Sequence, residues 1–125
     1  MAVMAYDEGL AERLRNLLDG QPGLTEKKMF GGLAFLLDGK MCCGIVKDEL
    51  LVRVSPENYT QAVKQPHAGP MDFTGRVMKG FVMVAQEGID RESDLEAWVE
   101  PSIVFVRTLL LEANKKKPAT KRRRR

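Results

Sequence analysis

The residue types that most often carry chemistry are scarce in this chain of 125 residues, which has two cysteines and one histidine. Cys42 and Cys43 are adjacent in a segment that reads as a strand, so we expect their side chains on opposite faces of a sheet. Such a pair cannot chelate one ion together, and His67 alone cannot complete a zinc site. We therefore expect no metal, no cofactor, and two small, buried, reduced thiols of the kind found in intracellular proteins.

Catalysis also lacks its recognisable parts. His67 lies in a loop between Pro66 and Ala68 with no serine motif in the chain to match it, and most carboxylates lie on helix faces and in turns, where they are usually solvated. Gly31 and Gly32 precede a strand and lack the spacing of a dinucleotide fingerprint or a P-loop, so they predict a bulge or bend in a sheet. We expect no catalytic residues and a protein that is not an enzyme.

The charges are divided unevenly along the chain. Residues 1–114 contain 12 Lys and Arg against 17 Asp and Glu, a net of −5, whereas residues 115–125 contain eight basic residues and no acid, a net of +8; together they give the overall +3. This basic segment has Ala119 as its one apolar residue, so we expect it to be disordered when free. It either attracts polyanions through phosphate contacts or serves only to keep the protein in solution.

Nucleic-acid attraction is the interpretation that we carry forward. A segment without a fixed shape cannot read base edges, so the contact would be non-specific, with DNA and RNA both open. The expected nucleic-acid-binding residues are Lys115, Lys116, Lys117, Lys121, Arg122, Arg123, Arg124 and Arg125.

Length and composition exclude several classes of protein. The length is that of one domain, and 44% hydrophobic with 30% charged residues is ordinary for a globular protein. The sequence has no long uncharged apolar run and no basic, apolar leader at its start, so we expect neither a membrane protein nor a secreted disulfide scaffold. The expected location is the cytoplasm.

Three helices are predicted from apolar spacing and end signals. Residues 7–18 carry a leucine stripe behind a capping Asp7. A second helix begins at Ser55-Pro56 and stops near Pro66, and a third begins at the capping box of residues 93–96 and continues to about Asn114. Pro101 lies inside the third helix and should kink or split it.

Five strands are predicted around these helices, at residues 33–37, 40–46, 50–54, 71–74 and 80–85. The resulting order is α-β-β-β-α-β-β-α, which predicts an α+β protein of two layers, with a five-stranded antiparallel sheet and the helices largely on one face.

Asp38-Gly39 is a two-residue hairpin signal that sets the pairing of its strands. It places Leu36 opposite Met41, Phe35 opposite Cys42 and Ala34 opposite Cys43, with facing residues on one side of the sheet. One side would carry Ala34, Leu36, Met41, Cys43 and Ile45, and the other would carry Leu33, Phe35, Leu37, Cys42 and Val46. Because both sides are apolar, we expect the second to be covered by another copy, the C-terminal helix or a ligand, and a homodimer is the suggestion we retain.

Several of these segments resemble the N-terminal domain of TfoX/Sxy proteins. The similarity extends from about residue 5 to residue 110 and rests on residues 28–35 (KMFGGLAF), Asp38-Gly39, 51–54 (LVRV), 70–76 (PMDFTGR), 79–82 (KGFV) and 95–98. The resemblance implies a two-layer α+β fold related to secretion chaperones. In the full-length regulators of this family it implies a role in switching on natural-competence genes with a cyclic-AMP-responsive transcription factor. Those regulators carry a second, helical domain, whereas this chain has only the basic segment after Asn114, and the family offers no known catalytic residues.

From the charge division and the family resemblance we expect a TfoX N-terminal-like domain at residues 1–114 and a disordered basic tail at residues 115–125. The expected function is that of a non-enzymatic bacterial regulator related to transcription or competence. Its folded body would contact proteins and its tail would contact nucleic acid. The alternative is a chaperone-like adaptor that holds a peptide or a partner protein on its sheet.

Overall fold

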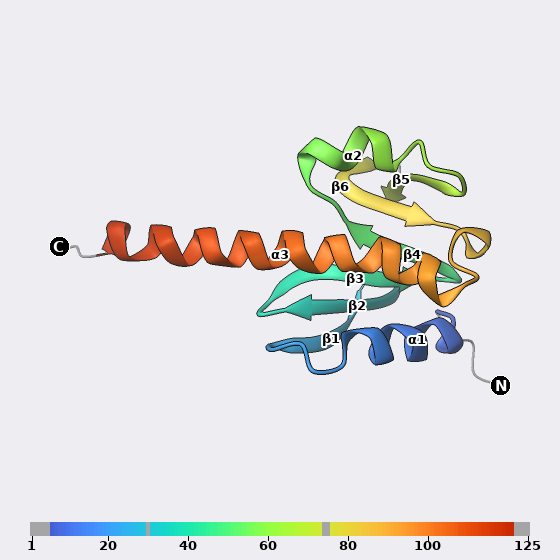
Figure 1. Ribbon diagram of the computed structural model, residues 1–125, viewed down its shortest axis with the longest axis horizontal. Coiled ribbons are helices and arrows are strands. Elements are labelled where there is room, and N and C mark those ends of the chain that lie inside the picture. Colours follow the sequence, from blue (N-terminus) through green and yellow to red (C-terminus); the bar gives the residue numbers. More distant parts are fainter. Residues whose placement is uncertain (1–5, 30, 74–75, 122–125) are drawn as a thin grey trace.

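The computed structural model describes residues 6–29, 31–73 and 76–121, with the backbone alone given for residues 72–79 and 114–121. An open antiparallel sheet has the strand order β1-β2-β3-β4-β6-β5, and α1 and α3 lie over one of its faces (Figure 1). The elements are α1 (Glu8–Leu18), β1 (Leu24–Met29), β2 (Gly32–Leu37), β3 (Lys40–Val46), β4 (Glu49–Arg53), α2 (Pro56–Ala62), β5 (Ala68–Phe73), β6 (Arg76–Val84), a 3₁₀ turn (Gln86–Gly88) and α3 (Glu92–Lys121). The predicted α+β class is confirmed.

The strand count was predicted as five and is six within the described residues. The missed strand is β1, an edge strand that pairs with β2 alone and exposes all but its two end residues, Leu24 and Met29. Its sequence LTEKKM has no apolar alternation because neither of its faces is buried deeply. A strand of this kind is specified by its neighbour rather than by its own pattern.

The first helix forms as its sequence predicts. The Asp7 carboxylate caps it by accepting hydrogen bonds from the backbone N–H groups of Gly9 at 2.8 Å and Leu10 at 3.3 Å. Leu10, Leu14 and Leu18 are buried in the core beneath the helix. The leucine stripe therefore fixes which side of α1 meets the sheet.

The β2–β3 hairpin has the predicted turn but a different register. Asp38 and Gly39 both have positive φ, and Leu36 pairs with Met41 as expected. A β-bulge then places one extra residue, Cys42, in β3, so Phe35 pairs with Cys43 and not with Cys42. Because of this shift, Cys43 lies on the same side of the sheet as Phe35, and the predicted division of these residues between the faces is wrong.

The core lies between the sheet and the two longer helices. Paired core residues run across the strands from Phe35 to Cys43 and Val52, and from there to Val82. The opposite side of the sheet carries Ala34, Leu51, Leu36, Met41 and Met83, of which the last three are partly exposed.

The third helix is longer and more continuous than predicted. It begins at Glu92, one residue before Ser93, and continues through Pro101 without a break (Figure 1). Pro101 and Ala97 are both exposed, so the carbonyl that loses its helical partner can be solvated. The predicted end near Asn114 is wrong, because the backbone continues as helix to Lys121. The lysines and the alanine of this segment are good helix formers. The division into a domain of residues 1–114 and a tail of residues 115–125 stays a prediction.

Candidate functional site: a groove between α2 and α3 and a basic helix end

A groove of about 380 Å³ separates α2 from the middle of α3. Its apolar wall is dominated by Trp98 and Phe105, seven residues apart on one side of α3. The described residues that line it are uncharged, and the α2 side contributes three carboxamides. The full lining is Val54, Ser55, Asn58, Gln61, Ala62, Gln65, Ala97, Trp98, Pro101 and Phe105. Its size and its mixture of apolar surface with a few polar groups are those of a binding groove for an uncharged molecule or peptide.

The short helix α2 presents these amides because of how it begins. Pro56 occupies its first turn and Ser55 precedes it in an extended conformation, as the sequence predicts, although the Ser55 hydroxyl makes no capping hydrogen bond. Tyr59 and Val63 pack against the core, which turns the opposite side of the helix toward α3.

A polar contact anchors α3 beside this groove. The Ser102 hydroxyl donates a hydrogen bond of 2.6 Å to the backbone carbonyl of Arg53 at the end of β4. The Arg53 guanidinium lies 5.6 Å from the ring centre of Phe81 and 5.9 Å from that of Phe105, within cation–π range of both rings. The groove wall is therefore tied to the sheet by one buried hydroxyl and one stacked arginine.

The two cysteines are buried and not joined by a disulfide. Both belong to the core cluster, so the prediction that they point to opposite faces is wrong, because Cys42 is the extra residue of the bulge. A hydrogen bond with the Cys43 thiol lowers the pKa of Cys42, and the charges of Arg107 and Arg53 act in the same direction. The same hydrogen bond, together with burial, raises the pKa of Cys43 well above its ordinary value. Of the pair, Cys42 is the one that ionises first.

The other residues that the sequence singled out have ordinary surroundings. His67 is exposed, in a turn with φ of 67°. The glycine pair forms no bulge within the sheet. Gly31 has a φ of 72° between β1 and β2, and Gly32 lies so close to β3 that a Cβ there would be 1.9 Å from the Ile45 carbonyl oxygen. Within the described ranges, the structure contains no group of three or more His, Cys, Asp or Glu placed to hold a metal ion.

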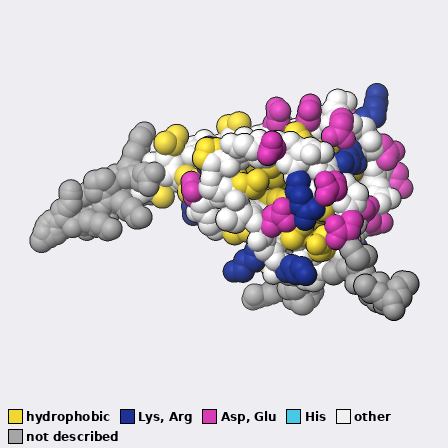
Figure 2. Space-filling model, turned by 90° about the horizontal axis from the view of Figure 1, so that it is seen from below, with side chains coloured by type: hydrophobic (Ala, Val, Ile, Leu, Met, Phe, Trp, Pro, Cys, Tyr) yellow, Lys and Arg dark blue, Asp and Glu magenta, His cyan; other side chains and the backbone are white. Residues whose placement is uncertain are grey.

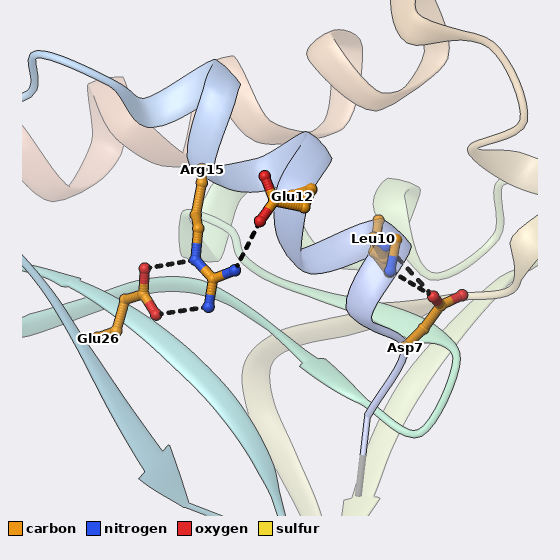
Figure 3. A network of polar contacts seen from close by, with 6 residues as sticks. Asp7, Leu10, Glu12, Arg15 and Glu26 are labelled. Carbon is orange, nitrogen blue, oxygen red and sulfur yellow. Dashed lines mark hydrogen bonds and ion pairs between the residues drawn. The ribbon is translucent and has the colours of Figure 1, made fainter. Parts of the chain in front are cut away.

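Two arginines of α1 form ion pairs with other elements of the body. Arg13 bonds to Glu92 at 2.8 Å and donates to the Ile89 carbonyl at 2.6 Å, which ties α1 to the start of α3. Arg15 forms a two-pronged pair with Glu26 at 2.8 and 3.0 Å (Figure 3). This contact holds the pKa of the Glu26 carboxyl below its usual value, mainly through the hydrogen bond. The first pair therefore joins the two longer helices, and the second joins α1 to β1 of the sheet.

Four of the eight basic residues predicted to bind nucleic acid lie in the C-terminal part of α3. Lys115, Lys116, Lys117 and Lys121 occupy positions on its helical backbone, whereas Arg122, Arg123, Arg124 and Arg125 lie outside the described residues. In Figure 1 this end of α3 extends beyond the sheet, and in Figure 2 the Asp and Glu side chains gather mostly at the opposite end of the body. The uneven charge of the sequence is therefore also a separation in space.

Comparison with known proteins identifies the fold. A family model for the TfoX N-terminal domain matches residues 16–106, from the last turn of α1 to the middle of α3. The chain belongs to the TfoX N-terminal domain family, as the resemblance in its sequence indicated. No curated protein matches it. Within the described residues, no helix is long and apolar enough to cross a membrane.

Sequence reasoning did not find the groove. Asn58 of α2 and Trp98 of α3 are 40 residues apart in the chain, and nothing local to either helix indicates that they face each other. The one available signal was the set of uncharged polar residues Asn58 and Gln61 on α2 and Gln65 just after it, where a solvated helix face is more often charged.

Proposed function

We propose that this member of the TfoX N-terminal domain family is a non-enzymatic, cytoplasmic binding protein related to transcription. In this proposal it contacts nucleic acid non-specifically through residues 115–125. The observation that carries the proposal is the charge division, −5 over residues 1–114 and +8 over the last eleven. A body of net negative charge repels phosphates, so we expect attraction to nucleic acid to come from residues 115–125.

The strength of such a contact can be worked out from the charges. If all eight basic residues neutralise phosphates of duplex DNA, the logarithm of the binding constant falls with the logarithm of salt concentration with a slope of about −7. Between about 50 and 200 mM salt the affinity would then fall by up to about 10⁴-fold. A contact through fewer residues gives a proportionally shallower slope.

The test compares three proteins by fluorescence anisotropy with one labelled duplex over a range of salt. The full chain should bind with a steep slope, and the chain ending at Asn114 should lose measurable binding. A third protein, with residues 115–125 shuffled, should bind like the full chain, since its charge is unchanged and base reading is not involved. Binding by the shortened chain with the same slope would refute the proposal, and a large loss in the shuffled chain would refute its non-specific character.

A second candidate function is a chaperone-like adaptor for a protein or peptide, with the basic segment incidental. The groove between α2 and α3 favours it, because the carboxamides of Asn58, Gln61 and Gln65 can pair with peptide backbone beside the apolar surface of Trp98. Binding of uncharged peptides that survives removal of residues 115–125 and is lost on Trp98→Ala would support this function. Binding that is insensitive to Trp98→Ala would count against the groove as the surface involved.

A homodimer belongs to both proposals. The sequence suggested that the side of the sheet opposite the core is covered by another copy. Leu36, Met41 and Met83 lie on that side and are partly exposed, which is compatible with the suggestion. The structure offers a different surface, described next.

A further inference from the structure

The outward side of α3 carries two large apolar side chains in water. Val104 is 65% exposed and Leu111 is 62% exposed. They are seven residues apart in one helix, so they lie about 20° from each other around its axis, and exposed Ala97 continues the same line seven residues earlier. Ala97, Val104 and Leu111 thus form one apolar line, which we call the α3 stripe.

Among the described residues, this stripe faces away from the sheet. Ser102 and Val106, both buried against the sheet, flank Val104 in the sequence and lie about 160° away from it around the helix. A shallow hollow runs beside the stripe, lined by Ser93, Glu96, Ala97, Glu100, Pro101 and Val104. The surface therefore has both a projecting apolar line and a depression that can receive a side chain.

Charge along α3 changes sign near its middle. Residues 92–106 include the acids Glu92, Asp94, Glu96 and Glu100 and no basic residue. Residues 107–121 include Arg107, Lys115, Lys116, Lys117 and Lys121 against the single acid Glu112. This distribution of charge suits the helix dipole within one chain. It also makes the acidic half of α3 in one copy complementary in charge to the basic half of α3 in another copy.

We propose that two copies of this chain pair antiparallel through their α3 stripes, around a two-fold axis midway between Val104 and Leu111. In this register Val104 of each copy faces Leu111 of the other copy, which gives the two equivalent contacts that a self-complementary interface requires. Positions equally far outside that pair place Glu100 opposite Lys115 and Ala97 opposite Pro118. The hollow bounded by Glu96 and Glu100 then lies opposite positions 115–119 of the second helix.

Antiparallel pairing is selected over parallel pairing by charge. In a parallel pair Glu100 would face its own copy and so would Lys115, and the two basic segments would lie side by side and repel. Since each copy contributes few large apolar side chains, we expect a weak dimer, with a dissociation constant of about 10–100 µM. This inference does not depend on nucleic-acid binding, and its test contains no nucleic acid.

The first experiment is sedimentation of nuclease-treated full-length protein between about 5 and 300 µM at about 150 mM salt. The wild-type protein should shift from monomer to dimer over this range. The double variant Val104→Lys/Leu111→Lys should stay monomeric, and it should remain folded because both side chains are exposed. Ala113→Lys, which adds a charge on the opposite side of α3, is the matched control and should dimerise like the wild type.

A charge exchange then tests the register. Glu100→Lys and Lys115→Glu should each weaken the dimer about threefold or more, and the double variant Glu100→Lys/Lys115→Glu should recover the wild-type affinity. In a parallel pair the exchange rescues nothing, so failure of the rescue overturns the antiparallel register. A wild-type protein that is monomeric throughout the range overturns the proposal. The proposal is also overturned if the dimer persists in Val104→Lys/Leu111→Lys and is lost in Met83→Lys. That result would assign dimerisation to the exposed side of the sheet.

Discussion

Replacing Ser102 by alanine removes the hydroxyl that joins the middle of α3 to the end of β4. Ser102 is 1% exposed, and its Oγ donates to the Arg53 carbonyl at 2.6 Å. Leaving a partly buried acceptor without its partner costs about 1–3 kcal/mol, and alanine returns about 0.5 kcal/mol through its higher helix propensity. We expect Ser102→Ala to lower the free energy of unfolding by about 1–2 kcal/mol.

The assay is urea denaturation followed by circular dichroism, with thermal unfolding as a second measurement. For a chain of this length the expected loss lowers Tm by about 4–8 °C. The slope of the urea transition should stay the same, because the substitution changes a contact and not the surface exposed on unfolding.

Thr108→Ala is the matched control for this prediction. Its hydroxyl makes the same kind of bond to a carbonyl four residues earlier, to Val104 at 3.0 Å, but on the exposed side of α3. Removing it should change stability by less than about 0.5 kcal/mol. Equal effects of the two substitutions would refute the reasoning, because burial of the acceptor would then play no part.

Three further outcomes are expected. Gly32→Ala should strongly destabilise or prevent pairing of β2 with β3, since its Cβ would be 1.9 Å from the Ile45 carbonyl oxygen; a urea midpoint close to wild type would contradict this. Glu26→Gln should cost about 0.2–1 kcal/mol at neutral pH, because the carboxylate is 35% exposed. Arg15 lowers the Glu26 pKa in the folded state, so this stabilisation is present above about pH 4.3 and is lost as pH falls through the folded pKa. The free energies of unfolding of wild type and variant should therefore converge in acid. A constant difference between them down to about pH 2 would contradict the linkage. Thiol reagents should label the native protein slowly and the unfolded protein fast, and rapid native labelling of Cys42 would show that the bulge opens.

Local signals predicted the parts of the fold that local chemistry decides. The Asp7 cap and the leucine stripe define α1, and Asp38-Gly39 defines its turn through two positive φ values, so all of these were correct. Pro101 was interpreted locally too, and that expectation was wrong, because its position on the exposed side of α3 lets the helix continue. A proline's effect depends on what surrounds it as well as on its missing N–H group.

The residues that could not be predicted depend on neighbours far away in the chain. β1 is a strand because β2 offers it hydrogen bonds, and its own sequence shows no apolar alternation. The bulge at Cys42 is a feature of how β3 pairs with β2, and with it both thiols lie in one core. The groove beside Trp98 exists only because α2 and α3 are brought together by the sheet.

The sequence by itself determined the α+β class, the family resemblance and the separation of an acidic body from a basic end, because composition, periodicity and turn chemistry are local quantities. Tertiary structure alone decided which surfaces are free. Between residues 103 and 111, α3 carries apolar residues around most of its circumference, and the sheet can cover only one side of it. The position of the sheet relative to α3 therefore decides that Val104 and Leu111 face water and not the core.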